Sequence, residues 1–315
     1  MIKDKEDQAD ISSQENRPHR WEKREPPHRK RRTIQVENTI PSRVRPGYGD
    51  PHTMSHMYPF LVSVPHGGVD VPEEVSDAVA LDQDAISYFS DPGTRDIFGL
   101  SDCACAYIDT PISRMIVDLN RPPYHLPPKR WDGVVKTRTS TGVPVYKDGQ
   151  FPEITLIHRL LLRYYFPYHA MLDRLLDGGS IVMAFDCHSM LPSAPGEGHG
   201  SGRERPLVCL GNNGDSLGNQ RKGALATCPG EVIRVLSDEF KVLYPDKGNV
   251  ALNTPFRGGF ISNAHYWHKG IPWIQIELNR SLYENRRDGG HAELQDNVRK
   301  VLSGFWKKVQ EKELL

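Results

Sequence analysis

Short apolar runs interrupt an otherwise polar chain, and most of them are too short and too continuous to form amphipathic helices. The first run, Phe60–Val64, ends at Pro65. Comparable runs follow at residues 104–109, 115–119, 180–185, 207–210 and 273–278. Continuous apolar runs of this length are typical of strands that are buried on both faces of a sheet. We therefore predict a buried strand at each of these positions.

Apolar residues recur at helical spacing in three longer segments. The best of these is 154–176, where Pro167 predicts a kink or a break because proline removes a helical hydrogen bond. Segments 230–243 and 294–313 predict two further helices. Buried strands interleaved with helices are typical of α/β domains whose sheet is covered on both faces. The pattern predicts a three-layer α/β sandwich around a mostly parallel or mixed central sheet.

The first 55 residues differ from the rest, because they mix Lys, Arg, Glu, Pro and Ser with almost no apolar cluster. Such a composition cannot bury enough apolar surface to fold alone. We predict a disordered or loosely attached arm over residues 1–55 and a globular domain over 56–315. The basic run His28–Arg32 is either a localisation or anion-binding patch or, as is commoner, a plain solvated tail.

Charge and composition exclude several classes of function. The 40 basic and 40 acidic residues give a formal net charge of +0, which offers no electrostatic basis for nucleic acid as a partner. No apolar run reaches the ~18 residues that cross a bilayer, and the N-terminus lacks the apolar core of a secretory signal. Five scattered cysteines fit free thiols better than a disulfide framework. We expect a cytoplasmic protein without nucleic-acid or membrane partners, and the sequence predicts no oligomeric state.

Histidines stand at the ends of two predicted strands. His66 follows the first strand and precedes two glycines. His188 follows the strand over 180–185, and Asp186 lies two residues before it, where it can orient the imidazole or bind a metal itself. Ligands of open α/β sheets bind in the crevice at the carboxyl ends of the strands, and neutral imidazole is a common zinc ligand. The pair predicts a metal site; the alternative for each is a structural histidine that caps a turn.

Two carboxylates complete this candidate site. A catalytic zinc ion usually keeps three protein ligands, and Asp91 is the candidate third, although Asp before Pro-Gly is also a common start of a turn. Glu277 lies inside an apolar strand, where a carboxylate is costly unless it is paired, bound to metal or protonated. Glu277 is therefore a candidate general base. The alternative is an ion pair with Arg280 or another arginine.

Arginines gather near the same strands, which suits an anionic substrate because guanidinium groups bind carboxylates through two parallel hydrogen bonds. Arg114, Asn120 and Arg121 flank the apolar run 115–119. We predict that they hold the substrate, unless Asp118 neutralises one of the arginines structurally.

The last candidate residues lie beside or after a glycine pair, Gly258-Gly259. Arg257 lies in the segment Phe256–Gly259, which is either a lid that closes over a carboxylate or a tight turn. Tyr266 comes after it and is a candidate hydrogen-bond donor to an oxyanion. Arg280, after the last predicted strand, places a further positive charge near the site and is a candidate substrate ligand.

Taken in order, six short motifs resemble the N-formylglutamate amidohydrolase family. They are Ser63-Val64-Pro65-His66-Gly67-Gly68, Ser90-Asp91, Val117-Asp118-Leu119-Asn120-Arg121-Pro122, Asp186-Cys187-His188-Ser189, Phe256-Arg257-Gly258-Gly259 and Gln275-Ile276-Glu277-Leu278. The ordered set spans roughly residues 60–285, most of the predicted domain. The resemblance implies a fold similar to that of zinc carboxypeptidases, a divalent metal with Zn²⁺ the leading candidate, and hydrolysis of the linear amide of an N-acyl amino acid.

The resemblance also implies roles for individual residues. In that family N-formyl-L-glutamate yields formate and glutamate late in histidine breakdown. His66 and His188 would bind the metal, with Asp91 as the third ligand, and Glu277 would be the base. A clamp for the small anionic substrate would be formed by Arg114, Asn120 and Arg121.

Two other functions are consistent with these motifs: a zinc carboxypeptidase that acts on peptides, and a non-catalytic relative that binds a carboxylate. A narrow, arginine-lined pocket favours the small substrate, an open groove favours peptides, and a Glu277 remote from the metal favours binding alone. Segments 122–148 and 193–205 depart from the family pattern and leave the acyl group and the amino acid open. A serine nucleophile is a poor fit, since no Gly-x-Ser-x-Gly motif is present.

Overall fold

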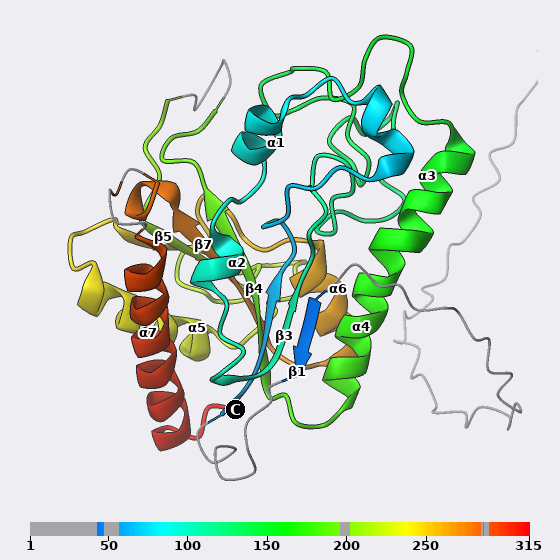
Figure 1. Cartoon of the computed structure of the whole chain (residues 1–315). Helices are drawn as coiled ribbons and strands as arrows, with labels where there is room; N and C mark the ends of the chain where they lie inside the picture. The colour runs from blue at the N-terminus through cyan, green and yellow to red at the C-terminus, as the bar shows by residue number, and fades with distance from the viewer. Residues whose placement is uncertain (1–42, 47–56, 196–201, 285, 287–289) are drawn as a thin grey trace, which may run out of the picture. The chain divides into compact units, whose positions relative to one another are not determined.

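A mixed β-sheet organises the part of the chain that the structure, a computed structural model, describes: residues 43–46, 57–195, 202–284, 286 and 290–315 (Figure 1). Within these residues the sheet has seven strands in the order β1-β3-β2-β4-β7-β5-β6. Their bounds are β1 Arg43–Pro46, β2 Tyr58–Val64, β3 Ala104–Asp109, β4 Met183–Met190, β5 Val208–Gly211, β6 Val250–Leu252 and β7 Trp273–Asn279.

The central strands of this sheet are parallel and its edges are not. β3, β2, β4 and β7 run in one direction. β1 pairs antiparallel with β3 at one edge, whereas β5 pairs antiparallel with β7 and is followed by the parallel β6 at the other. The carboxyl ends of β2, β4 and β7 therefore meet at one edge of the sheet, and the start of β5 lies beside them.

Helices cover both faces of the sheet, which confirms the predicted three-layer α/β sandwich (Figure 1). The first face packs against α2 (Thr94–Ile97), α5 (Gly230–Leu243), α7 (His291–Glu311) and the short η4 (Arg280–Leu282). The second face packs against η2 (Glu73–Ala78), α1 (Gln83–Phe89), α3 (Ile154–Leu160), η3 (Leu161–Tyr165), α4 (Phe166–Asp177) and α6 (Phe260–Lys269). No helix in the described ranges is both long and apolar enough to cross a membrane.

Alternation along the central strands separates core from site. In β4, Phe185 and Cys187 enter the first apolar cluster, where burial of the large ring contributes about 1.5–3 kcal/mol. On the opposite face of β4, Ala184 belongs to the second apolar cluster, but Asp186 and His188 follow it toward the carboxyl end. β7 repeats this change from apolar to polar. The same strand thus anchors the core with one face and presents ionisable groups with the other.

The predicted helix over 154–176 is interrupted where Pro167 requires it. α3 passes into the π-helical turn η3, and α4 then begins with Pro167 in its first turn. A proline in the first turn loses no helical hydrogen bond, because its N–H would have no partner there. The π-helical turn therefore accommodates the proline without ending the helical segment.

The predicted strand over 115–119 is wrong. This segment forms turns, in which the N–H groups of Ile116 and Val117 donate to the carbonyl of Ser113 at 3.0 and 3.1 Å. Its apolar side chains are nevertheless buried in the second cluster. Burial explains the apolar run, and periodicity alone does not distinguish a buried turn from a short strand.

Most of the predicted N-terminal arm lies outside the described residues, as does the basic run His28–Arg32. The exception is β1, whose pairing with β3 the sequence analysis does not predict. The helices α1, α2 and α6 and the strand β6 are also absent from that prediction. All five cysteines are free.

Candidate active site

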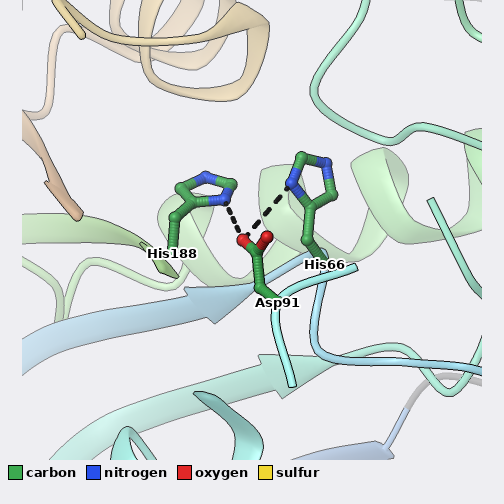
Figure 2. A group of neighbouring side chains, drawn as sticks. All are labelled: His66, Asp91 and His188. Atoms are coloured by element: carbon green, nitrogen blue, oxygen red, sulfur yellow. Dashed lines mark hydrogen bonds and ion pairs between the residues drawn. The ribbon is translucent and has the colours of Figure 1, made fainter. Parts of the chain in front are cut away.

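Three side chains from separate elements meet above the carboxyl end of the sheet (Figure 2). His66 follows β2, Asp91 lies between α1 and α2, and His188 belongs to β4. The Oδ2 atom of Asp91 lies 3.1 Å from Nδ1 of His188 and 3.7 Å from Nδ1 of His66. One donor atom from each side chain lies within 4.8 Å of the others, and all three residues are buried. We call these three residues the metal cluster.

The donor set of the metal cluster fits a divalent ion. His66 Nδ1 is buried and has no hydrogen-bond partner. Two ligands of one tetrahedral zinc ion lie about 3.3 Å apart when each bond is 2.0–2.1 Å. The 3.1 and 3.7 Å separations lie on either side of this value. Two imidazole nitrogens and a carboxylate are also the donors that zinc prefers.

A carboxylate lies at the far nitrogen of each imidazole. Nε2 of His66 lies 2.7 Å from Oδ1 of Asp118, a hydrogen bond that fixes the tautomer and leaves Nδ1 free to bind a metal. Nε2 of His188 lies 3.0 Å from Oδ1 of Asp186, which forms no hydrogen bond with the described residues, and 3.0 Å from Nδ2 of Asn120. Asp186 therefore acts on His188 through its negative charge, which is consistent with an orienting role.

Asp91 both starts a turn and points at the histidines. Its carbonyl accepts hydrogen bonds from Thr94, through the backbone N–H at 3.3 Å and Oγ1 at 2.6 Å, as α2 begins. Burial raises the pKa of Asp91, but the neighbouring His188, His66 and Arg114 outweigh burial and hold the pKa below its ordinary value. The turn and the site are therefore not alternatives, because the turn positions the carboxylate.

A buried lysine, Lys136, which the sequence motifs do not single out, supports this network. Nζ of Lys136 lies 2.9 Å from Oδ2 of Asp118, and Arg114 Nη2 donates to the same oxygen at 3.1 Å. Burial alone would raise the pKa of Asp118. The positive charges of Lys136 and Arg114 outweigh burial and keep this pKa well below its usual range. Asp118 thus remains ionised while it holds His66. The apolar pair Val134-Val135 before Lys136 was the available signal for a buried lysine.

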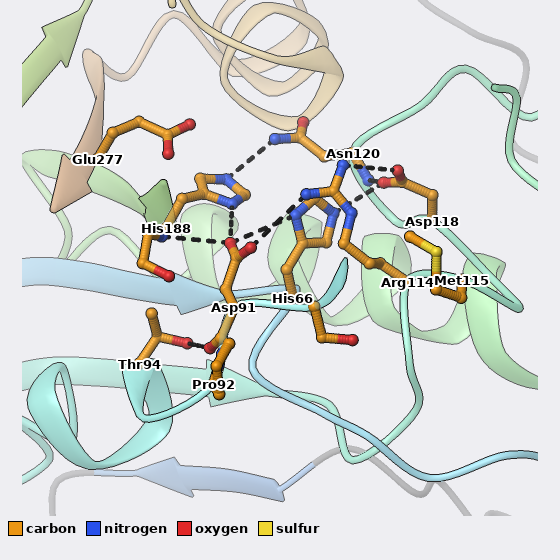
Figure 3. A network of polar contacts seen from close by, with 12 residues as sticks. His66, Asp91, Pro92, Thr94, Arg114, Met115, Asp118, Asn120, His188 and Glu277 are labelled. Carbon is orange, nitrogen blue, oxygen red and sulfur yellow. Dashed lines mark hydrogen bonds and ion pairs between the residues drawn. The ribbon is translucent and has the colours of Figure 1, made fainter. Parts of the chain in front are cut away.

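Glu277 lies on β7 directly opposite His188 on β4, and it is buried (Figure 3). Nε2 of Gln275 donates to its Oε1 at 2.7 Å. Burial, followed by the charges of Asp91 and Asp186, raises the pKa of Glu277 to about 8 against the lowering effect of His188 and Arg114. Among the described residues Glu277 forms no ion pair within 4.0 Å. The alternative of a structural ion pair with Arg280 is therefore not realised.

A cavity of about 410 Å³ opens onto the metal cluster and Glu277. Its other charged lining residues are Arg114, Arg121, Asp132, Lys136, Arg205, Arg257 and Arg280. Cations predominate, so the cavity suits an anionic ligand.

Comparison with known proteins relates this site to a family. The model of the N-formylglutamate amidohydrolase family matches residues 58–284. The chain belongs to this amidohydrolase family. A curated relative, the N-formylglutamate deformylase of Pseudomonas putida, is 26% identical over 239 residues, which cover 71% of this chain and 81% of the relative. The protein is accordingly an amidohydrolase of the N-formylglutamate type.

Two solved structures share the fold of this amidohydrolase. The N-formylglutamate amidohydrolase of Ralstonia eutropha JMP134 superposes with a TM-score of 0.66 at 19% identity, covering 87% of this chain and 99% of that one. A gene product of Agrobacterium tumefaciens superposes with a TM-score of 0.63 at 15% identity, covering 86% and 95%. At such identities the likeness concerns the fold alone.

The amidohydrolase brings most of the predicted substrate ligands to the cavity but engages several of them within the protein. Arg121 Nη2 donates to Asp132 at 2.9 Å. Asn120 Nδ2 donates to Asp186 at 2.9 Å, and its Oδ1 accepts from the N–H of Ile261 at 2.8 Å. These contacts make Asn120 a link between β4 and α6. Its binding of substrate stays a prediction.

The remaining predicted residues differ in position. Arg280 is buried, and its guanidinium donates to the carbonyls of Tyr88, at 2.8 Å, and Ser90, which places it in the cavity wall. Arg257 is exposed at the cavity. Tyr266 does not line the cavity, because α6 turns it toward the second apolar cluster. The position of Tyr266 therefore gives no support to its predicted role as oxyanion donor in the amidohydrolase.

Proposed function

We propose that this chain is a Zn²⁺-dependent enzyme that hydrolyses N-formyl-L-glutamate to formate and glutamate, a step late in histidine breakdown. The observation that carries the proposal is the buried, unpartnered Nδ1 of His66, which faces Asp91 and His188 in the cavity that also holds Glu277. Membership of the family supports the substrate. The nitrogen and carboxylate donors support zinc over metals that prefer oxygen ligands alone.

His66 Nδ1, His188 Nδ1 and Asp91 would hold the ion, and three protein ligands leave a position for water. When bound, the ion supplies a water of lowered pKa and a polarised substrate carbonyl. The protein's own part is to orient the two imidazoles. Asp118 fixes the tautomer of His66 through a hydrogen bond, and Asp186 places a negative charge 3.0 Å from Nε2 of His188.

Glu277 is placed to move the proton. Gln275 occupies Oε1 of Glu277, so Oε2 remains to take a proton from the attacking water and to return it to the leaving amine. The carboxylate faces the cavity beside His188 rather than an arginine. This access favours a catalytic protein over a relative that only binds a carboxylate.

The cavity supports a small substrate. A cavity of about 410 Å³ with a cationic lining can hold a short dianion. Arg114 contacts Asp91 at 3.6 Å through Nη1 and also lines the cavity. From there it can stabilise the negative charge that develops on the substrate carbonyl as the tetrahedral intermediate forms.

The test is metal analysis of the full chain together with a hydrolysis screen of formyl-, acetyl- and succinyl-amino acids. We expect about one zinc ion per chain, release of formate from N-formyl-L-glutamate, loss of activity with a chelator and recovery with Zn²⁺. Activity that persists after complete metal removal contradicts the proposal. Preferential release of C-terminal residues from peptides would favour the carboxypeptidase instead.

A further inference from the structure

The cations of the cavity fall into two classes. Arg114, Arg121 and Lys136 each contact a carboxylate of the protein at 3.1 Å or less. Arg280 is buried against backbone carbonyls and lies 3.5 Å from Glu284. These four charges are compensated within the fold. Among the cavity residues that the structure describes, Arg205 and Arg257 form no ion pair.

Arg205 differs from Arg257 in being held in place. Its guanidinium carbon lies 5.1 Å from the centre of the Phe256 ring, a cation–π contact. Its Nη1 donates to the carbonyl of Leu191 at 3.4 Å. The backbone of Arg205 is fixed as well, because its N–H donates to Pro192 at 2.9 Å and its carbonyl accepts from Asn279. A fixed guanidinium loses little entropy when it binds a ligand.

One edge of this guanidinium has no partner. Nε is buried without a hydrogen bond, and Nη2 forms none with the described residues. Nε and Nη2 together form the side-on edge with which arginine binds both oxygens of a carboxylate. A buried donor without a partner is costly, so a carboxylate that enters the cavity gains both hydrogen bonds and relieves that cost.

The order of the strands that carry His188, Glu277 and Arg205 indicates which carboxylate of the substrate Arg205 would bind. His188 lies on β4, Glu277 on the neighbouring β7, and Arg205 just before β5, whose first residue pairs with Leu278 of β7. Glu277 therefore lies on the strand between β4 and β5. Strands are about 4.8 Å apart, so β5, which begins shortly after Arg205, lies roughly 10 Å from β4. A carboxylate at Arg205 is remote from the reacting amide, as the side-chain carboxylate of an acyl glutamate is.

We propose that Arg205 determines specificity by binding the side-chain carboxylate of the substrate, which makes N-acyl dicarboxylic amino acids the preferred class. The inference rests on the proposed function. Arg205, which the sequence motifs do not single out, would thus select substrates with an acidic side chain over those with a neutral one. Arg257, which is exposed and forms no ion pair or side-chain hydrogen bond within the described part of the chain, remains available for the other carboxylate.

The test compares N-formyl-L-glutamate with N-formyl-L-glutamine, which has the same shape but no side-chain charge. In Arg205→Met, kcat/KM for the glutamate substrate should fall roughly 10- to 150-fold, mainly through KM, because a charge-assisted pair is lost. The glutamine substrate should keep its wild-type value. Arg205→Lys should recover part of the loss. Arg163→Ala, which removes an exposed ion pair with Glu74, is the matched control and should change neither substrate.

Equal losses on both substrates would make Arg205 a structural residue and overturn the inference, as would a selective loss in Arg257→Met with none in Arg205→Met. A second measurement needs no turnover: calorimetric titration of the full, metal-loaded chain with glutarate and with its monoamide. Glutarate should bind wild type more tightly than Arg205→Met by a similar factor. Equal affinity, or no binding to wild type, overturns the inference even if the chain hydrolyses no formyl amino acid.

Discussion

Two pairs of neighbouring histidines in this molecule use their ring nitrogens differently. In the pair that spans α4 and α6, His169 Nδ1 lies 2.9 Å from His265 Nε2, while the outer nitrogens bond to the carbonyl of Leu119 at 3.0 Å and to Asp173 at 2.9 Å. All four ring nitrogens have protein partners. In the metal cluster, the inner nitrogens do not bond to each other but face one carboxylate, with Nδ1 of His188 at 3.1 Å and Nδ1 of His66 at 3.7 Å from Oδ2 of Asp91. Nδ1 of His66 has no hydrogen-bond partner. This convergence on one carboxylate, rather than the number of histidines, distinguishes the candidate ligands from the structural pair.

The largest effect is expected at the base beside the cluster. Glu277→Gln removes the group that carries the proton, so kcat should fall about 10²–10⁴-fold. Metal content should not change, because Glu277 is not among the ligands of the cluster. Steady-state kinetics combined with metal analysis decide the matter. Near-normal turnover would exclude Glu277 as the base.

A smaller effect is expected at the carboxylates behind the rings. Asp186→Asn removes the negative charge that lies 3.0 Å from Nε2 of His188 and should lower metal affinity or activity about 10–100-fold. Asp173→Asn makes the same chemical change behind His265 and serves as the matched control. Metal titration of both variants should show a loss only in the first. Similar losses of metal affinity in both variants would contradict the distinction between the metal cluster and the pair His169 and His265.

Disruption of the pair His169 and His265 should reduce the stability of the fold and leave the metal content unchanged. His169→Phe leaves the carbonyl of Leu119 and Nε2 of His265 without their partner, which should lower the free energy of unfolding by about 1–3 kcal/mol. Urea denaturation measures the loss, and metal analysis of the folded variant should give the wild-type stoichiometry. Loss of zinc at unchanged stability would show that this pair belongs to the site.

The smallest effect is a dependence of stability on pH. Burial, then the neighbouring His265, lowers the pKa of His169 to about 3. The unfolded chain, with an ordinary histidine pKa near 6.5, then binds more protons than the folded chain between these values. Stability is complete above about pH 6.5 and should fall toward pH 3 by at most about 1.4 kcal/mol per pH unit for this group. Denaturation at several pH values should show a shallower slope in His169→Phe than in wild type.

The sequence predicted the central strands because burial on both faces leaves a continuous apolar run, as in β2 and β3. It failed at residues 115–119, where an equally apolar run is buried as turns. Helix α6 was missed because its buried positions are few and its remaining residues are polar. Local pattern thus reports burial reliably and backbone conformation less so.

The site shows the same limit. His66, His188 and Glu277 could be predicted, since each stands at or within an apolar strand where an ionisable group is conspicuous. Lys136 and Arg205 lie in irregular segments, and their significance depends on partners far along the chain, such as Asp118 and Phe256. Sequence spacing carries no information about such pairings. The contacts in the described residues also distinguish the predicted arginines that are paired within the protein from those that remain free to bind a ligand. Composition cannot make this distinction.

The alternation of β4 has a consequence for how this protein can change. Deleting one residue before Asp186 would rotate every following side chain to the opposite face, so that Cys187 would enter the cavity while the imidazole of His188 would be driven into hydrocarbon. Insertions and deletions in this strand should therefore destroy fold and activity together. Only exchanges of one side chain for another can alter the chemistry here without dismantling the scaffold.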